Sequence, residues 1–186
     1  SDLNKYIVFF FKQKPAYEIR SRLAEKDPGV YESDLAISCN NLGILYSDLN
    51  RYTEAEEYYK RAYEIYARLA EKNSEAYESD LAMSCNNLGN LYGRLNRHTE
   101  VEEYYKRTYE IYDRLSKVNP VAYEPKLVAP CIFVAYAAGM SGNIEEAKEY
   151  CDRGMKVVKR MKERGEDVEK IEVLINKLLA MLDEEE

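Results

Sequence analysis

Apolar residues recur along this 186-residue chain at the spacing of helices. Cys39, Leu42, Gly43 and Tyr46 stand at i, i+3, i+4 and i+7, which is the pattern of one buried helical face. The pattern predicts a first helix over roughly residues 33–48, with this face turned toward a core.

A second helix is expected to follow directly. Thr53 and Glu56 have the spacing of a capping box, in which the hydroxyl bonds free backbone amides and the carboxylate reaches back. The same pair recurs at Thr99 and Glu102. The inward stripe of the second helix consists of small and aromatic residues: Ala55, Tyr59, Ala62 and Tyr66.

The connection between these two helices is short. Because only residues 49–52 separate them, the helices are predicted to run antiparallel as a hairpin. Gly43 and Ala55 are small and are expected to let the two backbones approach closely.

The whole pattern is repeated. Residues 24–69 and 70–115 align without a gap, and 34 of the 46 positions are identical. A third, degenerate copy follows at the same offset, marked by Tyr123, Cys131 and Tyr150. We predict a partial N-terminal repeat with only its second helix (1–26), two full units (27–72 and 73–118), a degenerate unit (119–164) and a C-terminal capping helix (165–186).

The two ends of the chain depart from the repeat. Residues 7–15 replace a polar segment of the later copies, either through divergence of a terminal repeat or because the segment is not native, and Pro15 is expected to interrupt a helix. Pro130 is expected to kink the first helix of the third unit. Asp167 is expected to cap a last helix with an apolar face: Ile171, Leu174, Ile175, Leu178 and Leu182.

The spacing of Leu42-Gly43, Tyr46, Ala55, Tyr59 and Ala62 resembles the tetratricopeptide consensus, in its long-helix, kinesin-light-chain-like form. The resemblance covers about residues 27–164, although the period is 46 residues instead of the usual 34. It implies an all-α, right-handed superhelical solenoid of antiparallel helical hairpins. It also implies a non-catalytic scaffold or adaptor that binds a protein or peptide in a concave groove lined by the first helices.

Helical-wheel positions opposite the buried stripe define the expected groove. In the three units these are Ile37, Asn40, Asn41, Ile44, Ser47 and Asp48; Met83, Asn86, Asn87, Asn90, Gly93 and Arg94; and Ile132, Tyr136 and Met140. Four of the twelve differences between the two close copies fall here: Ile37/Met83, Ile44/Asn90, Ser47/Gly93 and Asp48/Arg94. They are explained either by tuning of the groove or by drift at tolerant exposed positions.

The groove residues suggest how a ligand is held. Asn40 and Asn86 suit peptide-backbone clamps, because an amide donates and accepts together, whereas Asn41 and Asn87 are candidates for bonds to the adjacent helix. Arg94 is expected to meet an acidic group. Some chaperone-binding relatives hold a terminal carboxylate with Lys and Arg, but Asn occupies the first such position here, so we do not expect that clamp.

Composition and charge narrow the partners. A net charge of −7 and a pI near 5.1 argue against nucleic acid and against a polyanionic membrane surface. Apolar residues never run long enough to span a bilayer, and the four cysteines are too sparse for a disulfide scaffold. Cytoplasmic localisation is the default expectation.

No catalytic or metal-binding constellation is expected. His98 is the single histidine, expected as a solvated loop side chain, and no cofactor motif is present. Cys39, Cys85 and Cys131 recur once per unit and are expected in the core, with a Cys131–Cys151 disulfide as the alternative for the last. The alternative functions are self-association through the N-terminal end of the stack to form a homo-oligomer and, least favoured, a thiol-dependent enzyme.

Overall fold

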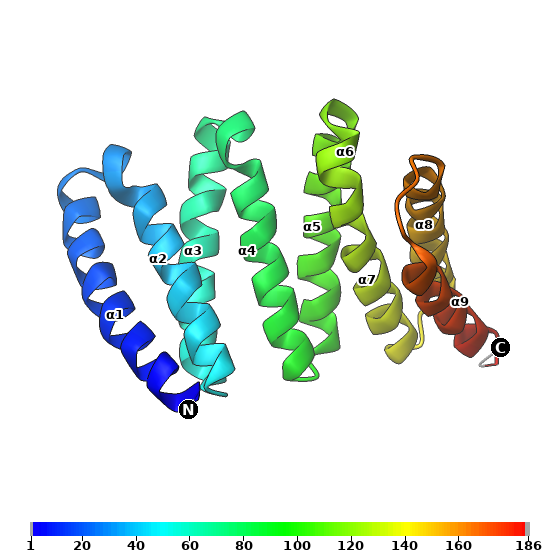
Figure 1. Ribbon diagram of the computed structural model, residues 1–186, viewed down its shortest axis with the longest axis horizontal. Coiled ribbons are helices and arrows are strands. Elements are labelled where there is room, and N and C mark those ends of the chain that lie inside the picture. The colour runs from blue at the N-terminus through cyan, green and yellow to red at the C-terminus, as the bar shows by residue number, and fades with distance from the viewer. Residues whose placement is uncertain (1, 185–186) are drawn as a thin grey trace. The chain divides into compact units, whose positions relative to one another are not determined.

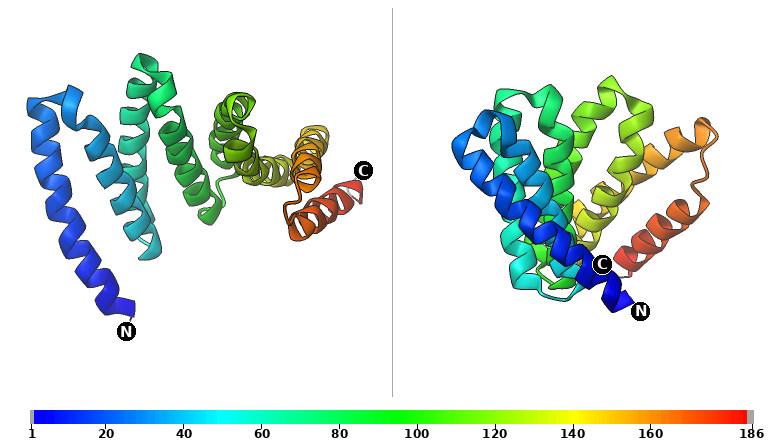
Figure 2. Two further views of the ribbon diagram at one scale, coloured as in Figure 1. Left: turned by 45° about the horizontal axis from the view of Figure 1, so that its top comes forward. Right: turned by 60° about the vertical axis from the view of Figure 1, so that its left-hand side comes forward.

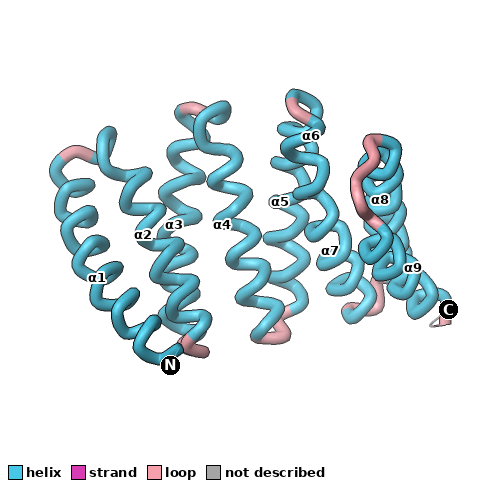
Figure 3. Tube along the Cα trace, viewed as in Figure 1, coloured by secondary structure: helices cyan, strands magenta, loops and turns pink. Residues whose placement is uncertain are grey.

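The computed structural model describes residues 2–184, with side chains from residue 12 onward. Every regular element in this range is a helix (Figures 1 and 3), which confirms the predicted all-α class. The helices are α1 (Asp2–Lys26), α2 (Pro28–Asp48), α3 (Tyr52–Lys72), α4 (Ser74–Arg94), α5 (His98–Val118), α6 (Pro120–Tyr123), the 3-10 turn η1 (Glu124–Leu127), α7 (Val128–Met140), α8 (Ile144–Glu163) and α9 (Glu169–Asp183).

The chain forms two compact units, Ser1–Leu91 and Tyr92–Glu186, each described here by itself. In the first unit α1 packs on α2 and α2 on α3. In the second, α7 packs on α5 and α8, and α8 packs on α9. Both views of Figure 2 show the helices of a pair side by side and antiparallel, as predicted for hairpins.

Each hairpin is closed by a residue in the left-handed region that ends the first helix. Asn50 has φ 57°, Asn96 has φ 54° and Gly142 has φ 78°. Asn and Gly tolerate this conformation, which ends a helix and returns the chain. After Asn50, the amide of Arg51 donates to the carbonyl of Tyr46 at 2.8 Å. This turn sets the antiparallel direction of the next helix.

The predicted capping box at Thr53 is wrong. Helix α3 begins at Tyr52 with Arg51 as its N-cap residue, and no side chain caps it. After the turn at Asn50, α3 begins one residue before Thr53, so Thr53 lies within the first turn and is exposed. Arg51, at the N-cap position, pairs with Glu54. Helix α2 likewise begins at Pro28, before the predicted residue 33, since a proline in the first turn needs no amide partner.

The predicted core positions are confirmed. Cys39, Leu42, Ala55 and Ala62 are completely buried, and Tyr46, Tyr59 and Tyr66 are at most 5% exposed. The atoms nearest to a Cβ placed on Gly43 belong to the ring of Tyr59. The missing side chain at Gly43 therefore makes room for an aromatic ring between the two helices.

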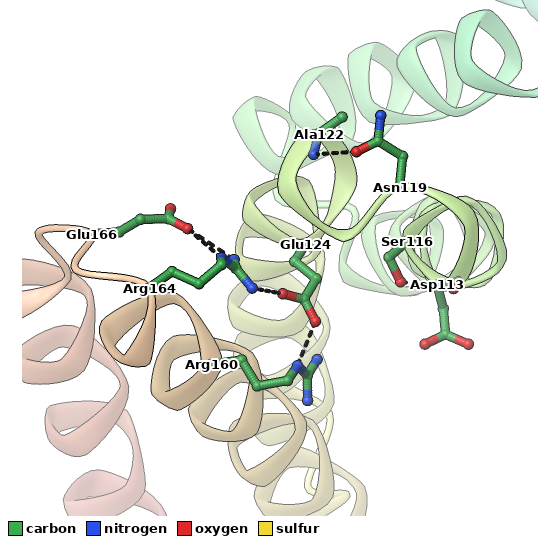
Figure 4. Close-up of polar contacts among 8 residues, drawn as sticks. All are labelled: Asp113, Ser116, Asn119, Ala122, Glu124, Arg160, Arg164 and Glu166. Atoms are coloured by element: carbon green, nitrogen blue, oxygen red, sulfur yellow. Dashed lines mark hydrogen bonds and ion pairs between the residues drawn. The ribbon is translucent and has the colours of Figure 1, made fainter.

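Ion pairs join the start of a first helix to the end of the following second helix. Glu32 accepts from Arg68 at 2.6 Å. At the equivalent positions 92 residues later, two repeat periods on, Glu124 is paired with Arg160 (Figure 4). Glu124 is only 6% exposed and also pairs with Arg164. Burial alone would raise the pKa of Glu124, but the hydrogen bonds from Arg164 and Arg160 outweigh it and hold this pKa below its ordinary value.

Two prolines do not act as predicted. Helix α1 runs continuously through Pro15, because the loss of one backbone hydrogen bond does not end a helix of 25 residues. Pro130 lies in the first turn of α7, where its missing amide has no helical acceptor, and the irregular turn lies earlier, at η1.

One segment in the described part of the chain, Pro120–Met140, is long and apolar enough to cross a membrane by length and composition. The expectation that no stretch met these criteria is thus corrected. Half of this segment is buried, including Val134, Ala135 and Ala138, and it packs between α5 and α8. Core helices meet the same criteria, and this packing accounts for the apolar composition of the segment.

Helix α9 carries the predicted apolar residues on two sides. Ile175 and Leu182 are buried, whereas Leu174 is 50% exposed. Asp167 accepts from the amide of Glu169, but the N-cap position is Val168, whose side chain caps nothing. The prediction that Leu174 belongs to the packed face is wrong, because α9 meets α8 and α7 along a narrow strip.

Candidate functional site

The first helices of the first unit expose apolar side chains at the predicted groove positions. Ile37 and Ile44 of α2 are 47% and 45% exposed, and Met83 of α4 is 47% exposed. Ile37 and Ile44 are seven residues apart, so they lie on one face of α2. Between them Asn41 is half-buried. This face offers apolar contact area to a ligand.

Asn40 does not face solvent as a clamp should. Its side chain is 6% exposed, and its Nδ2 donates to Ser84 Oγ at 3.1 Å. Its Oδ1 accepts from Asn87 Nδ2 at 3.3 Å. These bonds join α2 to α4 and occupy both the nitrogen and the oxygen of the Asn40 side-chain amide. The clamp assignment for Asn40 is therefore wrong, whereas Asn87 bonds to the adjacent helix as predicted.

Asn86, the copy of Asn40 in the next repeat, has a different environment. It is half-buried, and no hydrogen-bond partner of its side chain is found within residues 12–184. In the sequence, the residues that match Ser84 and Asn87 one repeat later are Pro130 and Phe133, which cannot exchange such bonds. Asn86 thus keeps the amide that a peptide-backbone clamp needs.

The remaining polar positions of the predicted groove are mixed. Asp48 and Asn90 are exposed, and Arg94 is exposed in the last turn of α4. Ser47 is 6% exposed, so its assignment to the groove is wrong. Ser47 directly follows the buried Tyr46 and lies at the border of the buried face of α2. At such a border, helical-wheel spacing does not distinguish a buried position from an exposed one.

In the second unit, α7 presents an aromatic and apolar face. Tyr136 is 45% and Met140 58% exposed, while Ile132 is half-buried. Phe133 is 39% exposed and stacks on Tyr105 with ring centroids 4.7 Å apart. The sequence prediction omitted Phe133, although the 46-residue offset places it at the position of Asn87.

His98 is more constrained than the predicted loop side chain. It is the first residue of α5, is half-buried, and its ring meets that of Tyr136 edge-on, with centroids 6.1 Å apart. Tyr136 is 45% exposed despite this contact. Among residues 12–184 no group of three or more His, Cys, Asp or Glu side chains is arranged to hold a metal ion.

The cysteines are buried, free thiols. Burial raises the pKa of Cys39 and of Cys131 to about 12, and that of Cys151 to about 11. A thiol with such a pKa is protonated at neutral pH, and the thiolate is the form that attacks. The environment of Cys131 and Cys151 therefore disfavours nucleophilic chemistry.

Three clefts among residues 12–184 contain no predicted groove residue. Two, of about 250 and 340 Å³, are lined by residues of α1, α2 and α3, including Arg61, and a third of about 470 Å³ lies at α8 and α9.

The family description that matches the sequence is the tetratricopeptide repeat, over residues 35–75 and 81–119. The first match runs from α2 to the start of α4, and the second runs from α4 to Asn119, directly after α5, so each spans a helical hairpin. Over these two stretches the chain consists of tetratricopeptide repeats. Repeats of this family serve in general as non-catalytic protein-interaction modules, which supports a protein-binding scaffold.

Solved structures share the tetratricopeptide-like fold. BtubC (BKLC) from P. vanneervenii superposes with a TM-score of 0.60 at 19% identity, over 97% of this chain and 73% of that one. Aspartyl phosphate phosphatase F from Bacillus subtilis gives 0.65 at 19% identity, over the whole of this chain and 48% of that one. At this identity the likeness shows the fold alone. No curated protein sequence matches this chain.

Proposed function

We propose that this repeat protein is a non-catalytic adaptor or scaffold that binds a segment of a partner protein on the exposed faces of its first helices. The ligand contacts Ile37, Ile44 and Met83 in the first unit. In the second unit, taken by itself, the exposed Tyr136 and Met140 form a face of the same kind. The observation that carries the proposal is the exposure of these apolar side chains at helical spacing, in a chain of which 33% of the residues are charged.

Polar residues add direction to the proposed binding. Asn86 donates to and accepts from the ligand backbone, because its amide is not used by a neighbouring helix as that of Asn40 is. Arg94, exposed at the end of α4, pairs with an acidic group of the ligand. The expected ligand is an extended or helical peptide with a polar portion and an apolar portion.

A random-sequence peptide library, selected on the wild-type protein, tests the proposal. The dissociation constants of the enriched peptides are then measured for the wild type and for Ile44→Glu, Asn86→Ala and Arg94→Glu. The proposal expects each variant to weaken binding by about tenfold, or about 1.4 kcal/mol. Glu64→Gln on α3 serves as the control and leaves binding unchanged.

Enriched peptides whose affinity is indifferent to all three variants would show that the first-helix faces are not the binding site. Sedimentation equilibrium of the free protein distinguishes the alternative of self-association. A concentration-independent monomer mass supports a heterologous partner, whereas a mass that rises with concentration favours a homo-oligomer.

A further inference from the structure

The cleft between α8 and α9, in the second unit, is a second docking surface with chemistry of its own. Its volume is about 470 Å³, and its lining includes Met155 and Val158, whose apolar side chains form its floor. Val158 is 1% exposed and Met155 is half-buried. The two helices lie side by side in Figures 1 and 2. Helix α8 supplies six of the seven lining residues, and α9 supplies Glu172. No residue of the proposed first-helix site takes part in it.

Three lysines and two carboxylates line this cleft. Lys156, Lys159 and Lys162 line it from α8 at helical spacing, together with Asp152 of α8 and Glu172 of α9. Lys162 forms an ion pair with Glu172 across the cleft at 2.9 Å. Over the residues that the structure describes, neither Lys156 nor Lys159 is paired with a carboxylate.

The charges on this face differ from those at the matching positions of the preceding repeat. On α3 and α5, Lys60, Lys106 and Lys117 are each paired with an acidic residue four positions earlier, whereas the exposed Lys72 of α3 has no such partner. At the positions of Lys156 and Lys159, helix α5 carries Glu110 and Asp113. The third repeat therefore has lysine at two positions where the preceding repeat has a carboxylate, although Asp152 stands where α5 has Lys106.

We propose that the α8–α9 cleft binds an acidic amphipathic segment of a partner protein. Apolar side chains of the segment enter the cleft and cover Met155, while its carboxylates pair with Lys156 and Lys159. The exposed Lys162–Glu172 pair contributes little to stability and opens at small cost, so that Lys162 also becomes available. The positive rim selects an acidic partner and speeds its association.

The geometry of the cleft favours a protein segment over an anionic membrane. A membrane-binding face projects its apolar side chains beyond the charged ones. Here the apolar residues form the floor, with Val158 almost fully buried, and the lysines project. A segment narrow enough to enter the cleft reaches both, whereas a flat lipid surface reaches only the charges.

The test uses two fluorescein-labelled peptides of about 14 residues, or roughly four helical turns. One has Leu on one face of a helix and Glu on the other, and the second has Lys in place of every Glu. Fluorescence anisotropy with the full chain measures the affinity of each peptide at low and at high salt. We expect the acidic peptide to bind, the basic peptide not to bind, and binding to weaken with salt.

Matched variants locate the site. Lys156→Glu/Lys159→Glu is expected to weaken the acidic peptide at least about tenfold. Lys170→Glu/Lys177→Glu makes the same charge change on exposed positions of α9 that do not line the cleft, and is expected to change the affinity less than about twofold. Ile44→Glu should leave this affinity unchanged, because α2 is far from the cleft in sequence and belongs to the other unit.

Several outcomes would overturn the proposal. These are no binding of the acidic peptide, equal binding of both peptides, or an affinity that Lys156→Glu/Lys159→Glu does not change. Vesicles of phosphatidylserine and phosphatidylcholine test whether the cleft binds a lipid surface instead. If they bind the wild type with the same sensitivity to Lys156→Glu/Lys159→Glu while the peptide binds weakly, the site is a lipid surface and the inference is wrong.

Discussion

The ring of Tyr59 in α3 lies directly on Gly43 in α2. A Cβ atom added to Gly43 would come within 2.5 Å of Tyr59 Cε1, closer than real Cβ contacts allow. Tyr59 is 5% exposed and cannot move aside without disturbing the core of the hairpin. The absence of a side chain at residue 43 is thus a packing requirement of the repeat.

Gly43→Ala is expected to destabilise the protein by about 1–3 kcal/mol through overpacking. Gly93→Ala is the control, because the nearest atom to its added Cβ is Val101 Cγ2 at 3.9 Å. In that open position alanine is expected to stabilise helix α4 by up to about 1 kcal/mol. Urea unfolding followed by circular dichroism measures both changes. Equal stability of the two variants would contradict the close packing of Gly43 and Tyr59.

Asn40 and Asn86 are expected to differ although they are copies of one repeat position. Asn40→Ala leaves the buried Ser84 and its neighbour Asn87 without their partner, at a cost of about 1–3 kcal/mol. Asn86→Ala is expected to change stability by no more than about 0.5 kcal/mol. Unfolding free energies in urea check both values. A large loss of stability in Asn86→Ala alone would reverse the roles given to these two amides.

Most of the fold can be predicted from the sequence because the same pattern of apolar residues recurs in each repeat. The periodic Cys39, Leu42 and Tyr46 define the buried face, and the short connection after residue 48 defines the hairpin. Start and end positions were less predictable. A left-handed turn at Asn50, not the capping preference of Thr53, decides where α3 begins.

The candidate site was predictable only as a set of faces. The wheel places Ile37 and Asn40 on the same side of α2, yet one is exposed and the other is buried against α4. The difference depends on Ser84, which stands 44 residues away in the chain. Identical sequence around Asn86 does not give an identical environment, since the bonding partners come from the following repeat.

Glu124 is expected to make stability depend on pH. Its folded-state pKa is lowered, so its contribution is fully present above the unfolded pKa of about 4.3 and is lost as the pH falls through the folded pKa. Glu124→Gln is expected to lower the unfolding free energy at pH 7 by about 1–2 kcal/mol and to flatten its dependence on pH in the acid range.

The control for this prediction is Glu163→Gln, which removes the same charge from an exposed position of α8. Urea unfolding of the wild type and both variants at several pH values from neutral to acid provides the comparison. A Glu124→Gln protein with the same acid sensitivity as the wild type would show that the pairs with Arg160 and Arg164 do not stabilise the fold.

The thiols are expected to react slowly in the folded protein. Since burial raises the pKa of Cys39 and Cys131 to about 12 and that of Cys151 to about 11, little thiolate is present at pH 8. A chromogenic disulfide reagent should label all four cysteines only after unfolding in urea. A cysteine that reacts rapidly in the native protein would revive the thiol-enzyme alternative, and fewer than four free thiols would indicate a Cys131–Cys151 disulfide.

The decisive experiment maps a selected peptide onto the protein by two-dimensional nuclear magnetic resonance of the ¹⁵N-labelled chain. We expect the largest chemical-shift changes on the first helices of the first unit, at Ile37, Ile44, Met83 and Asn86, and only small changes on α3 and on the outer face of α5. Changes concentrated on these second helices, with the first-helix residues unaffected, would contradict this expectation.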